Sequence, residues 1–223
     1  MLIKKIVAGN DDRRSRLHDE KGNLVPLRRV LRNSPRAVFS GLGRKIFDYR
    51  PYLPWISYDA IRFLESFLNH DKTVLEYGSG MSTIWYANHV GQVFSVEDSE
   101  PWYRKALQLL KATRQENILY EFRTGVDYCA FMKDSGKRFD LIMIDGSDRA
   151  ACAASALGLV KDGGIIYLDN SDKHSSNAGG DTRLAEKVLL DFAKEKGADI
   201  QYFTDFCPCE FFVQQGMLVK LPD

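Results

Sequence analysis

The chain has 223 residues, 44% of them hydrophobic, and a formal net charge of +1. This length fits one domain with an extension, and the balanced charge gives no general argument for a nucleic-acid or membrane-surface partner. No apolar run approaches the roughly 18 residues of a transmembrane helix, and the first residues lack the apolar core of a signal peptide. Four scattered cysteines are too few for a disulfide framework. We therefore expect a reduced, cytoplasmic protein.

The first fifty residues differ in composition from the rest, which predicts a basic N-terminal arm at residues 1–50 and one domain at residues 51–223. The arm is rich in arginine, contains interrupting acids and shows little sustained periodicity. This pattern favours a solvated, partly extended segment that packs on the domain or on a second subunit, as in a homodimer. A basic patch for an anionic substrate or nucleic acid is the alternative, but the interrupting acids argue against nucleic acid.

From residue 58 onward, helical and strand patterns alternate. Apolar spacing predicts helices over residues 58–69, from 84, and over 101–110, 126–133, 150–159 and 182–196. Short apolar or alternating runs predict strands at 74–76, 92–97, 118–122, 139–145, 164–169, 199–204 and 211–220. The loop 205–210 is too short for a parallel crossover, so the last strand should run antiparallel. We expect an α/β fold, a three-layer Rossmann-like sandwich with a seven-stranded, mostly parallel sheet and an antiparallel last strand.

A glycine-rich turn joins the first strand to its helix. Glycine permits backbone angles closed to other residues, and such a corner is where nucleotide-like ligands bind in α/β sheets. A dinucleotide fingerprint needs a third glycine, whose place Thr83 takes here, and this weakens a nicotinamide interpretation. A turn without a ligand is the simplest alternative. The corner consists of Glu76, Gly78, Ser79, Gly80, Ser82 and Thr83.

Carboxylates stand at or near the carboxyl ends of four strands, the edge where ligands bind in open α/β sheets. Glu97 ends the second strand, where it could accept hydrogen bonds from both hydroxyls of a ribose. Asp127, just after the third strand, could receive an adenine amino group or could cap a helix instead. The strand-end acids are Glu76, Glu97, Asp98, Asp145 and Asp169.

With these motifs, residues 51 to 220 resemble a class I S-adenosylmethionine-dependent methyltransferase. The resemblance rests on four segments, Leu75–Thr83, Val93–Asp98, Phe139–Gly146 and Gly163–Asn170. The third glycine of the usual family motif is Ser82 here, as in the subgroup with Gly-Ser-Gly-x-Ser-Thr. The resemblance implies that the glycine corner lines the methionine end and the sugar, that Glu97 holds the ribose, and that Asp98 and Asp127 surround the adenine. The cofactor-binding residues so implied are Glu76, Gly78, Ser79, Gly80, Ser82, Thr83, Glu97, Asp98, Asp127 and Asp145.

Two of the strand-end segments also suggest a metal. Asp145, Asp169 and Asn170 supply oxygen donors of the kind that Mg²⁺ prefers, which is similar to the metal-dependent O-methyltransferases. Those enzymes carry a lysine base three residues past the first acid, where this chain has Asp148. Asp148 or His174 could serve as the base, together with Asp145. The alternative is that Asp145 and Asp169 only hydrogen-bond loops or cofactor.

The resulting hypothesis is an S-adenosylmethionine-dependent methyltransferase that methylates oxygen on a small molecule or a glycan. Methyl transfer needs proximity and alignment more than a protein nucleophile. A nicotinamide-dependent oxidoreductase and a non-catalytic cofactor-binding module are the alternatives. The acceptor pocket is expected at loops 49–56, 171–181 and 206–211, whose aromatic side chains include Tyr52, Trp55, Phe206 and Phe211.

Overall fold

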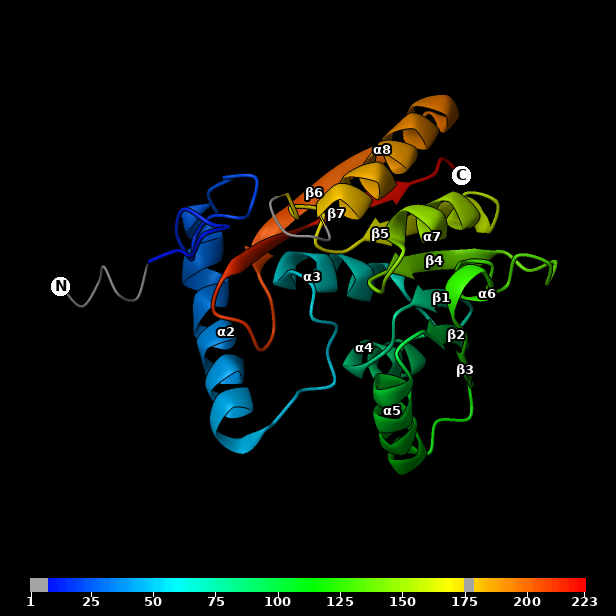
Figure 1. Cartoon of the computed structure of the whole chain (residues 1–223), viewed down its shortest axis with the longest axis horizontal. Helices are drawn as coiled ribbons and strands as arrows, with labels where there is room; N and C mark the ends of the chain where they lie inside the picture. The colour runs from blue at the N-terminus through cyan, green and yellow to red at the C-terminus, as the bar shows by residue number, and fades with distance from the viewer. Residues whose placement is uncertain (1–7, 175–178) are drawn as a thin grey trace.

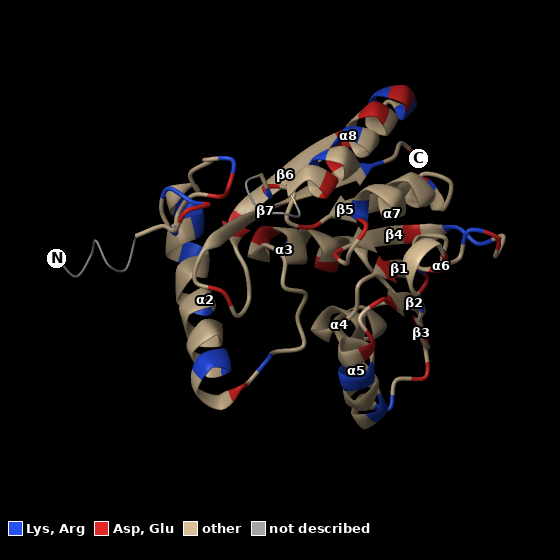
Figure 2. Cartoon of the chain, in the orientation of Figure 1, with Lys and Arg blue, Asp and Glu red and all other residues tan. Residues whose placement is uncertain are grey.

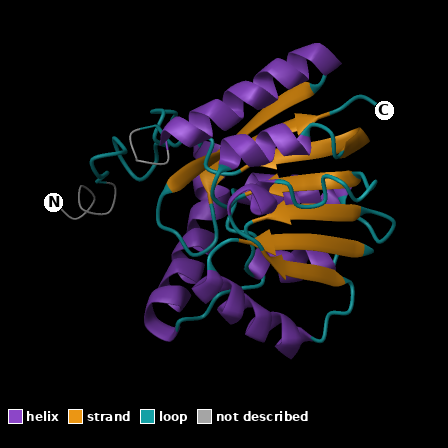
Figure 3. Cartoon of the chain, turned by 45° about the vertical axis from the view of Figure 1, so that its right-hand side comes forward, coloured by secondary structure: helices purple, strands orange, loops and turns teal. Residues whose placement is uncertain are grey.

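The computed structural model describes residues 8–174 and 179–223. Its centre is a seven-stranded sheet with helices on both faces (Figure 1, Figure 3). The strand order is β3-β2-β1-β4-β5-β7-β6, and β7 runs antiparallel to both of its neighbours. The strands are β1 (Thr73–Tyr77), β2 (Gln92–Glu97), β3 (Ile118–Phe122), β4 (Phe139–Ile144), β5 (Val160–Leu168), β6 (Asp199–Phe206) and β7 (Val213–Lys220). The predicted fold class, including the reversed last strand, is confirmed.

The helices cover the sheet in two sets, each with its own hydrophobic core. Side chains of α6, α7 and α8 form one core with the sheet, and side chains of α2, α3 and α4 form the other. β4 contributes to both, which explains why residues 141–144 of this strand are all apolar and alternate between the two cores. The helices are α2 (Leu27–Phe47), α3 (Tyr58–Phe67), α4 (Met81–Ala87), α5 (Glu100–Thr113), α6 (Gly125–Cys129), α7 (Arg149–Ala156) and α8 (Gly179–Lys196).

Two element boundaries differ from the prediction by four residues, and several others differ by fewer. The helix expected over residues 126–133 ends at Cys129, because the following residues form turns. β5 begins at Val160, four residues earlier than expected. Gly163 and Gly164 lie inside this strand, and glycine there conceals a strand pattern. Neither difference moves the strand ends that carry the predicted site residues.

The N-terminal segment is neither as extended nor as solvated as predicted. Residues 27–47 form the 21-residue helix α2, which ends at Asp48 in the left-handed conformation. This helix was not predicted, for two reasons. Pro35 lies within it, and proline is unusual inside a helix; in addition, most of its large apolar side chains face solvent, so their spacing does not indicate a buried face. Its buried side is made of small or polar residues, Asn33, Ala37 and Gly41.

Charged residues before α2 are buried in an ion-pair network. Arg13 Nη2 lies 3.1 Å from Glu20 Oε1 and 3.5 Å from Asp172 Oδ2, and all three side chains are almost fully inaccessible. The same Asp172 accepts hydrogen bonds from the backbone N–H groups of Glu20 and Gln215. The segment is therefore fixed to the sheet through β7.

No helix within residues 8–174 and 179–223 is long and apolar enough to cross a membrane.

Candidate functional site

The turn after β1 is shaped by its glycines. Gly78 has a φ of +88°, in the left-handed region, and a Cβ there would lie 2.7 Å from the Cα of Gly146. Gly78 is thus required where the loops after β1 and β4 touch. The next glycine, Gly80, donates its backbone N–H to Thr83 Oγ1 at 3.1 Å and precedes α4. The predicted strand, glycine turn and helix are therefore present.

Glu76, the last acid of β1, is fully buried and holds this turn together. Its carboxylate accepts hydrogen bonds from the hydroxyls of Ser82, Thr83 and Ser95, the last at 2.7 Å. Burial raises the pKa of Glu76 to about 7, although the three hydroxyls lower it. The Glu76 side chain links β1, β2 and α4 through these hydrogen bonds, so it stabilises the glycine turn.

Glu97 lies at the end of β2 and reaches the same turn. Its Oε2 accepts hydrogen bonds from the backbone N–H of Ser79 at 3.0 Å and from the Ser79 hydroxyl at 2.7 Å. Its Oε1 accepts one from the backbone N–H of Ser99 at 3.0 Å. The Ser79 oxygen is also 2.8 Å from the hydroxyl of Tyr120. A buried carboxylate is thus positioned beside the glycine turn, as a ribose-binding acid would be.

Two tryptophans enclose the space above the turn. Trp102 of α5 donates its indole N–H to the carbonyl of Ser79 at 2.7 Å. Together with Trp55, Gly80 and Asp145, it lines a cavity of about 90 Å³. A neighbouring cavity of about 570 Å³ shares Trp102 and Met81 with the first. Nucleotide-sized ligands need several hundred Å³, so a cofactor would have to use both spaces or displace these side chains.

The two acids predicted near the adenine follow the ends of β2 and β3. Asp98 accepts a hydrogen bond from the hydroxyl of Ser147, which joins the loops after β2 and β4. Asp127 is exposed in the first turn of α6, whose N-cap is Thr124. Asp127 therefore does not cap the helix, and its role at the adenine stays a prediction.

Asp145 and Asp169, at the ends of β4 and β5, lie next to each other. Burial raises the pKa of Asp169 well above its usual range, and the neighbouring Asp145 charge adds to this. Burial also raises the pKa of Asp145, but the Arg149 guanidinium opposes that shift. Each carboxyl also acts on the other, because Asp145 raises the pKa of Asp169 whereas Asp169 lowers the pKa of Asp145.

Arg149 occupies the position between these acids and Asn170. Its Nη2 lies 3.4 Å from Asp145 Oδ1 and 3.4 Å from Asn170 Oδ1. Its Nη1 donates to the carbonyl of Asp169 at 2.6 Å, and its Nε donates to the carbonyl of Gly146 at 2.9 Å. The guanidinium thus contacts side-chain oxygens of two of the three residues that were predicted to bind magnesium, Asp145 and Asn170. Among the residues that the structure describes, no group of three or more His, Cys, Asp or Glu side chains could hold a metal ion, and in this arrangement the donor set does not fit one.

The two other base candidates lie apart from this pair. Asp148 is exposed, has a φ of 44° and precedes α7 without a side-chain capping bond. His174 is exposed, and its backbone N–H donates to Glu20 Oε2 at 3.1 Å. The structure therefore places His174 beside the N-terminal network, with no contact to Asp145. Part of the loop 171–181 expected to line an acceptor pocket, residues 175–178, lies outside the described residues.

Of the four aromatic residues expected in the acceptor pocket, two are near the site. Trp55 lines the cavity at Gly80, and Tyr52 lines the neighbouring cavity. Phe206 is buried in the core, and Phe211 packs against Gly41 of α2.

Sequence reasoning overlooked several residues that shape the site. One is Asp181, whose carboxylate accepts the N–H groups of Arg149 and Ala150 and so caps α7 from α8; the others are Ser95, Trp102, Tyr120 and Arg149.

Comparison with known proteins agrees with this geometry at the level of the fold. No protein-family model and no curated protein matches the sequence. An O-methyltransferase from Bacillus cereus in complex with SAH superposes with a TM-score of 0.59 at 17% identity, covering 83% of this chain and 98% of that one. The O-methyltransferase TomG from Streptomyces achromogenes, in complex with SAM, superposes with a TM-score of 0.60 at 16% identity. This match covers 84% of this chain and 90% of that one.

An rRNA methylase from Streptococcus thermophilus is similar as well. It gives a TM-score of 0.56 at 13% identity and covers 78% of this chain and 98% of that one. The three solved enzymes act on different kinds of acceptor by their names, so the likeness fixes no substrate. The chain has the fold of the class I S-adenosylmethionine-dependent methyltransferases.

Proposed function

We propose that this protein is an S-adenosylmethionine-dependent methyltransferase that acts on oxygen of a small molecule or a glycan. The observation that carries the proposal is Glu97, a buried carboxylate held at the glycine turn through Ser79. The fold, shared with solved methyltransferases that contain SAM or SAH, supports it. Neither the nicotinamide-dependent oxidoreductase nor the non-catalytic module gains a specific supporting observation.

The cofactor site would be organised by Glu97 and Ser79. A carboxylate offers about four acceptor positions, and Glu97 uses three of them for Ser79 and Ser99. One position is left for a ribose hydroxyl. A second opens when the Ser79 hydroxyl turns fully to Tyr120, which lies within hydrogen-bond distance. Binding would therefore exchange an internal hydrogen bond for one to the ligand.

The proton of the acceptor hydroxyl would go to Asp145. S-adenosylmethionine, when bound, supplies a methyl group already activated on a sulfonium. Asp145 is half-buried at the cavity beside Gly80 and Trp55, and its pKa is raised by burial. A raised pKa makes a carboxylate a stronger base. Arg149 would hold Asp145 in place and balance its charge.

Magnesium is the second way in which these residues could function. A magnesium site would require Arg149 to move away, so that Asp145, Asp169 and Asn170 could hold the ion. We favour the first arrangement, because the guanidinium already contacts Asp145 Oδ1 and Asn170 Oδ1.

Titration calorimetry with S-adenosylhomocysteine tests the proposal directly. We expect saturable binding of this ligand and none of NAD⁺ or NADP⁺ under the same conditions. A thermal shift with S-adenosylhomocysteine should accompany it, because a ligand that binds only the folded state stabilises it. Binding of a nicotinamide nucleotide instead would overturn the proposal. Binding without turnover of any hydroxylated acceptor in a broad screen would favour the non-catalytic module.

A further inference from the structure

We propose that α2 is an interfacial helix that binds the surface of an anionic membrane. The proposal begins with side chains that neither the core nor the candidate site uses. Leu27, Leu31, Val38, Leu42 and Ile46 recur at intervals of four or seven residues, so they lie along one side of the helix. All five are exposed, Leu31 by 72% and Ile46 by 63%. A continuous apolar stripe of this kind marks a contact surface and not chance exposure.

The stripe lies on the side of α2 that points away from the sheet. The helix packs inward through Asn33, Ala37 and Gly41, which follow one another at four-residue intervals. Each residue turns the helix by about 100°, so the stripe and the adjacent Arg28, Arg32 and Arg36 together lie on the side away from these three residues. Figure 1 shows α2 at the margin of the molecule, beyond α3 and the ends of β6 and β7. A flat surface could reach this side of the helix.

The charge of α2 identifies the kind of partner. The helix contains six Lys and Arg residues and no Asp or Glu, and its ribbon in Figure 2 carries blue without red. Arg29 and Arg44 are paired internally with Asp59 and Glu210. Arg28, Arg32 and Arg36, spaced four apart beside the stripe, form no ion pair with any acid in the part of the chain that the structure describes. Their charge is therefore available to a negatively charged partner.

A second copy of this chain fits less well than a lipid surface. Pairing α2 with another α2 would bring like charges together beside the apolar stripe, and no acid on either helix would balance them. Nucleic acid would satisfy the arginines but would leave Leu27, Leu31 and Leu42 against a polar surface. An anionic bilayer satisfies both features, because apolar side chains enter the interface while basic side chains remain at the phosphates.

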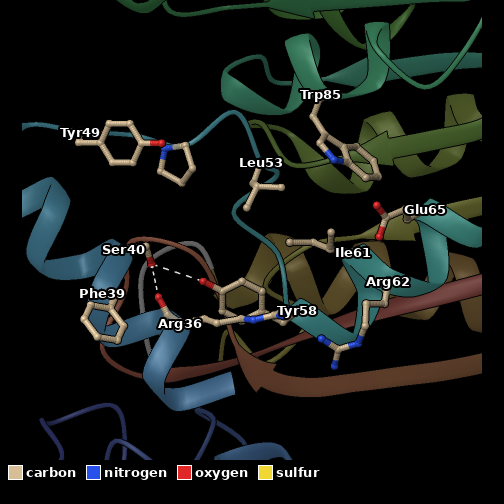
Figure 4. A pocket seen from close by; sticks show the side chains of 11 residues that line it. Arg36, Phe39, Ser40, Tyr49, Leu53, Tyr58, Ile61, Arg62, Glu65 and Trp85 are labelled. Atoms are coloured by element: carbon tan, nitrogen blue, oxygen red, sulfur yellow. Dashed lines mark hydrogen bonds between the residues drawn. The ribbon is translucent and has the colours of Figure 1, made fainter. Parts of the chain in front are cut away.

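Other large apolar side chains near the ends of α2 are also exposed, among them Leu24 before the helix and Phe47 and Tyr49 at its end. Alongside the helix, Arg36 and Phe39 border a cavity of about 520 Å³ whose other wall includes Ile61 and Trp85 (Figure 4). The helix is thus not packed tightly against α4, and its side chains can adjust to a surface.

Vesicle co-sedimentation of the full chain tests the inference. We expect binding to phosphatidylcholine vesicles that contain phosphatidylglycerol, little binding to phosphatidylcholine alone, and weakening as salt rises. The variant Arg32→Gln/Arg36→Gln should lower the partition coefficient about tenfold to thirtyfold, at roughly one kcal/mol for each basic residue near the surface. Leu31→Ser/Ile46→Ser should lower it by a similar factor at any salt concentration.

Matched controls keep the test specific. Val126→Ser, at an exposed apolar position on α6, and Lys194→Gln, at an exposed basic position on α8, should bind vesicles as the unchanged protein does. Equal binding to neutral and anionic vesicles, or equal losses in the controls, would overturn the inference. The inference would also be overturned if the protein bound no vesicles and instead formed a dimer in sedimentation velocity that Leu31→Ser/Ile46→Ser dissociates. Binding of an RNA oligonucleotide without binding of vesicles would overturn it as well.

Discussion

Arg149 and Asp145 are four residues apart at the start of α7, and their side chains meet with Nη2 3.4 Å from Oδ1. The contact places a cationic side chain of the protein beside the acid pair of Asp145 and Asp169. In magnesium-dependent sites of this composition the ion would provide that positive charge. The guanidinium thus supplies what the metal would supply, and this relationship can be tested.

Replacing Arg149 by alanine should create affinity for a divalent cation. The change leaves Asp145, Asp169 and Asn170 without their cation, and a divalent ion restores it. We expect Mn²⁺ or Mg²⁺ to bind the variant at least tenfold more tightly than the unchanged protein, measured by titration calorimetry. Arg104→Ala removes an exposed i,i+4 pair with Glu100 and should change nothing. Equally tight binding by the unchanged protein would instead support the magnesium arrangement.

Replacing Glu97 by glutamine should weaken the binding of S-adenosylhomocysteine. The amide cannot accept hydrogen bonds at both of its terminal atoms, and a hydrogen bond to a charged group contributes about 1.5–3 kcal/mol. We expect affinity to fall tenfold or more in titration calorimetry, while Glu100→Gln, an exposed change three residues on, leaves it unaltered. Unchanged affinity would mean that the ligand does not use this carboxylate.

The sequence predicted those parts of the protein in which pattern and burial agree. β4 is apolar because both faces are covered, and its carboxyl end could be located from the acid that follows it. The loop 205–210 alone implied the reversal of β7, since it is too short for a crossover. These inferences depend on local chemistry and chain length, and both are visible in a sequence.

Other features depend on contacts between distant residues, which a single sequence does not reveal. Arg149 was visible as a neighbour of Asp148, but its bonds to Asp169 and Asn170 exist only because β4 and β5 are adjacent. Asp181 caps α7 from another helix in the same way. The helix α2 was missed for the opposite reason, because its large apolar side chains face outward and do not mark a core.

The pH dependence of stability should report Glu76. Its pKa in the folded state, about 7, lies above the ordinary value of 4.5, so the folded state binds more protons than the unfolded state between these two values. Its contribution to stability is therefore greatest below pH 4.5 and is lost as the pH rises through 7. As the pH rises over this interval, the free energy of unfolding of Glu76→Gln should increase relative to that of the unchanged protein by up to roughly 3 kcal/mol.

Urea unfolding at several pH values measures this difference. Glu116→Gln, at an exposed position, provides the control and should follow the unchanged protein at every pH. A constant offset between Glu76→Gln and the unchanged protein from pH 5 to pH 8 would show that Glu76 does not change its charge there.

Gly78 should be far less tolerant of alanine than Gly125, although both have positive φ. At Gly125 a Cβ would meet nothing within 4 Å, so only the left-handed backbone opposes it, at about 1 kcal/mol. At Gly78 the Cβ would also lie 2.7 Å from the backbone of Gly146. We expect Gly78→Ala to destabilise the fold by at least ~2 kcal/mol more than Gly125→Ala, measured by denaturant unfolding. Similar losses would mean that the two loops can separate freely.

The segment before α2 should contribute to stability through Arg13. Its guanidinium lies between the buried carboxylates of Glu20 and Asp172 and donates to the carbonyl of Val213 on β7. Alanine there leaves two negative charges uncompensated, and breaking a buried pair in this way costs about 3–5 kcal/mol. Lys173, which also contacts Glu20, balances part of that charge, so the lower end of the range is expected. Arg14→Ala, at the exposed neighbouring position, should cost less than about 0.5 kcal/mol. If the two variants unfold at the same urea concentration, the segment is held by other contacts and the ion pairs contribute nothing net.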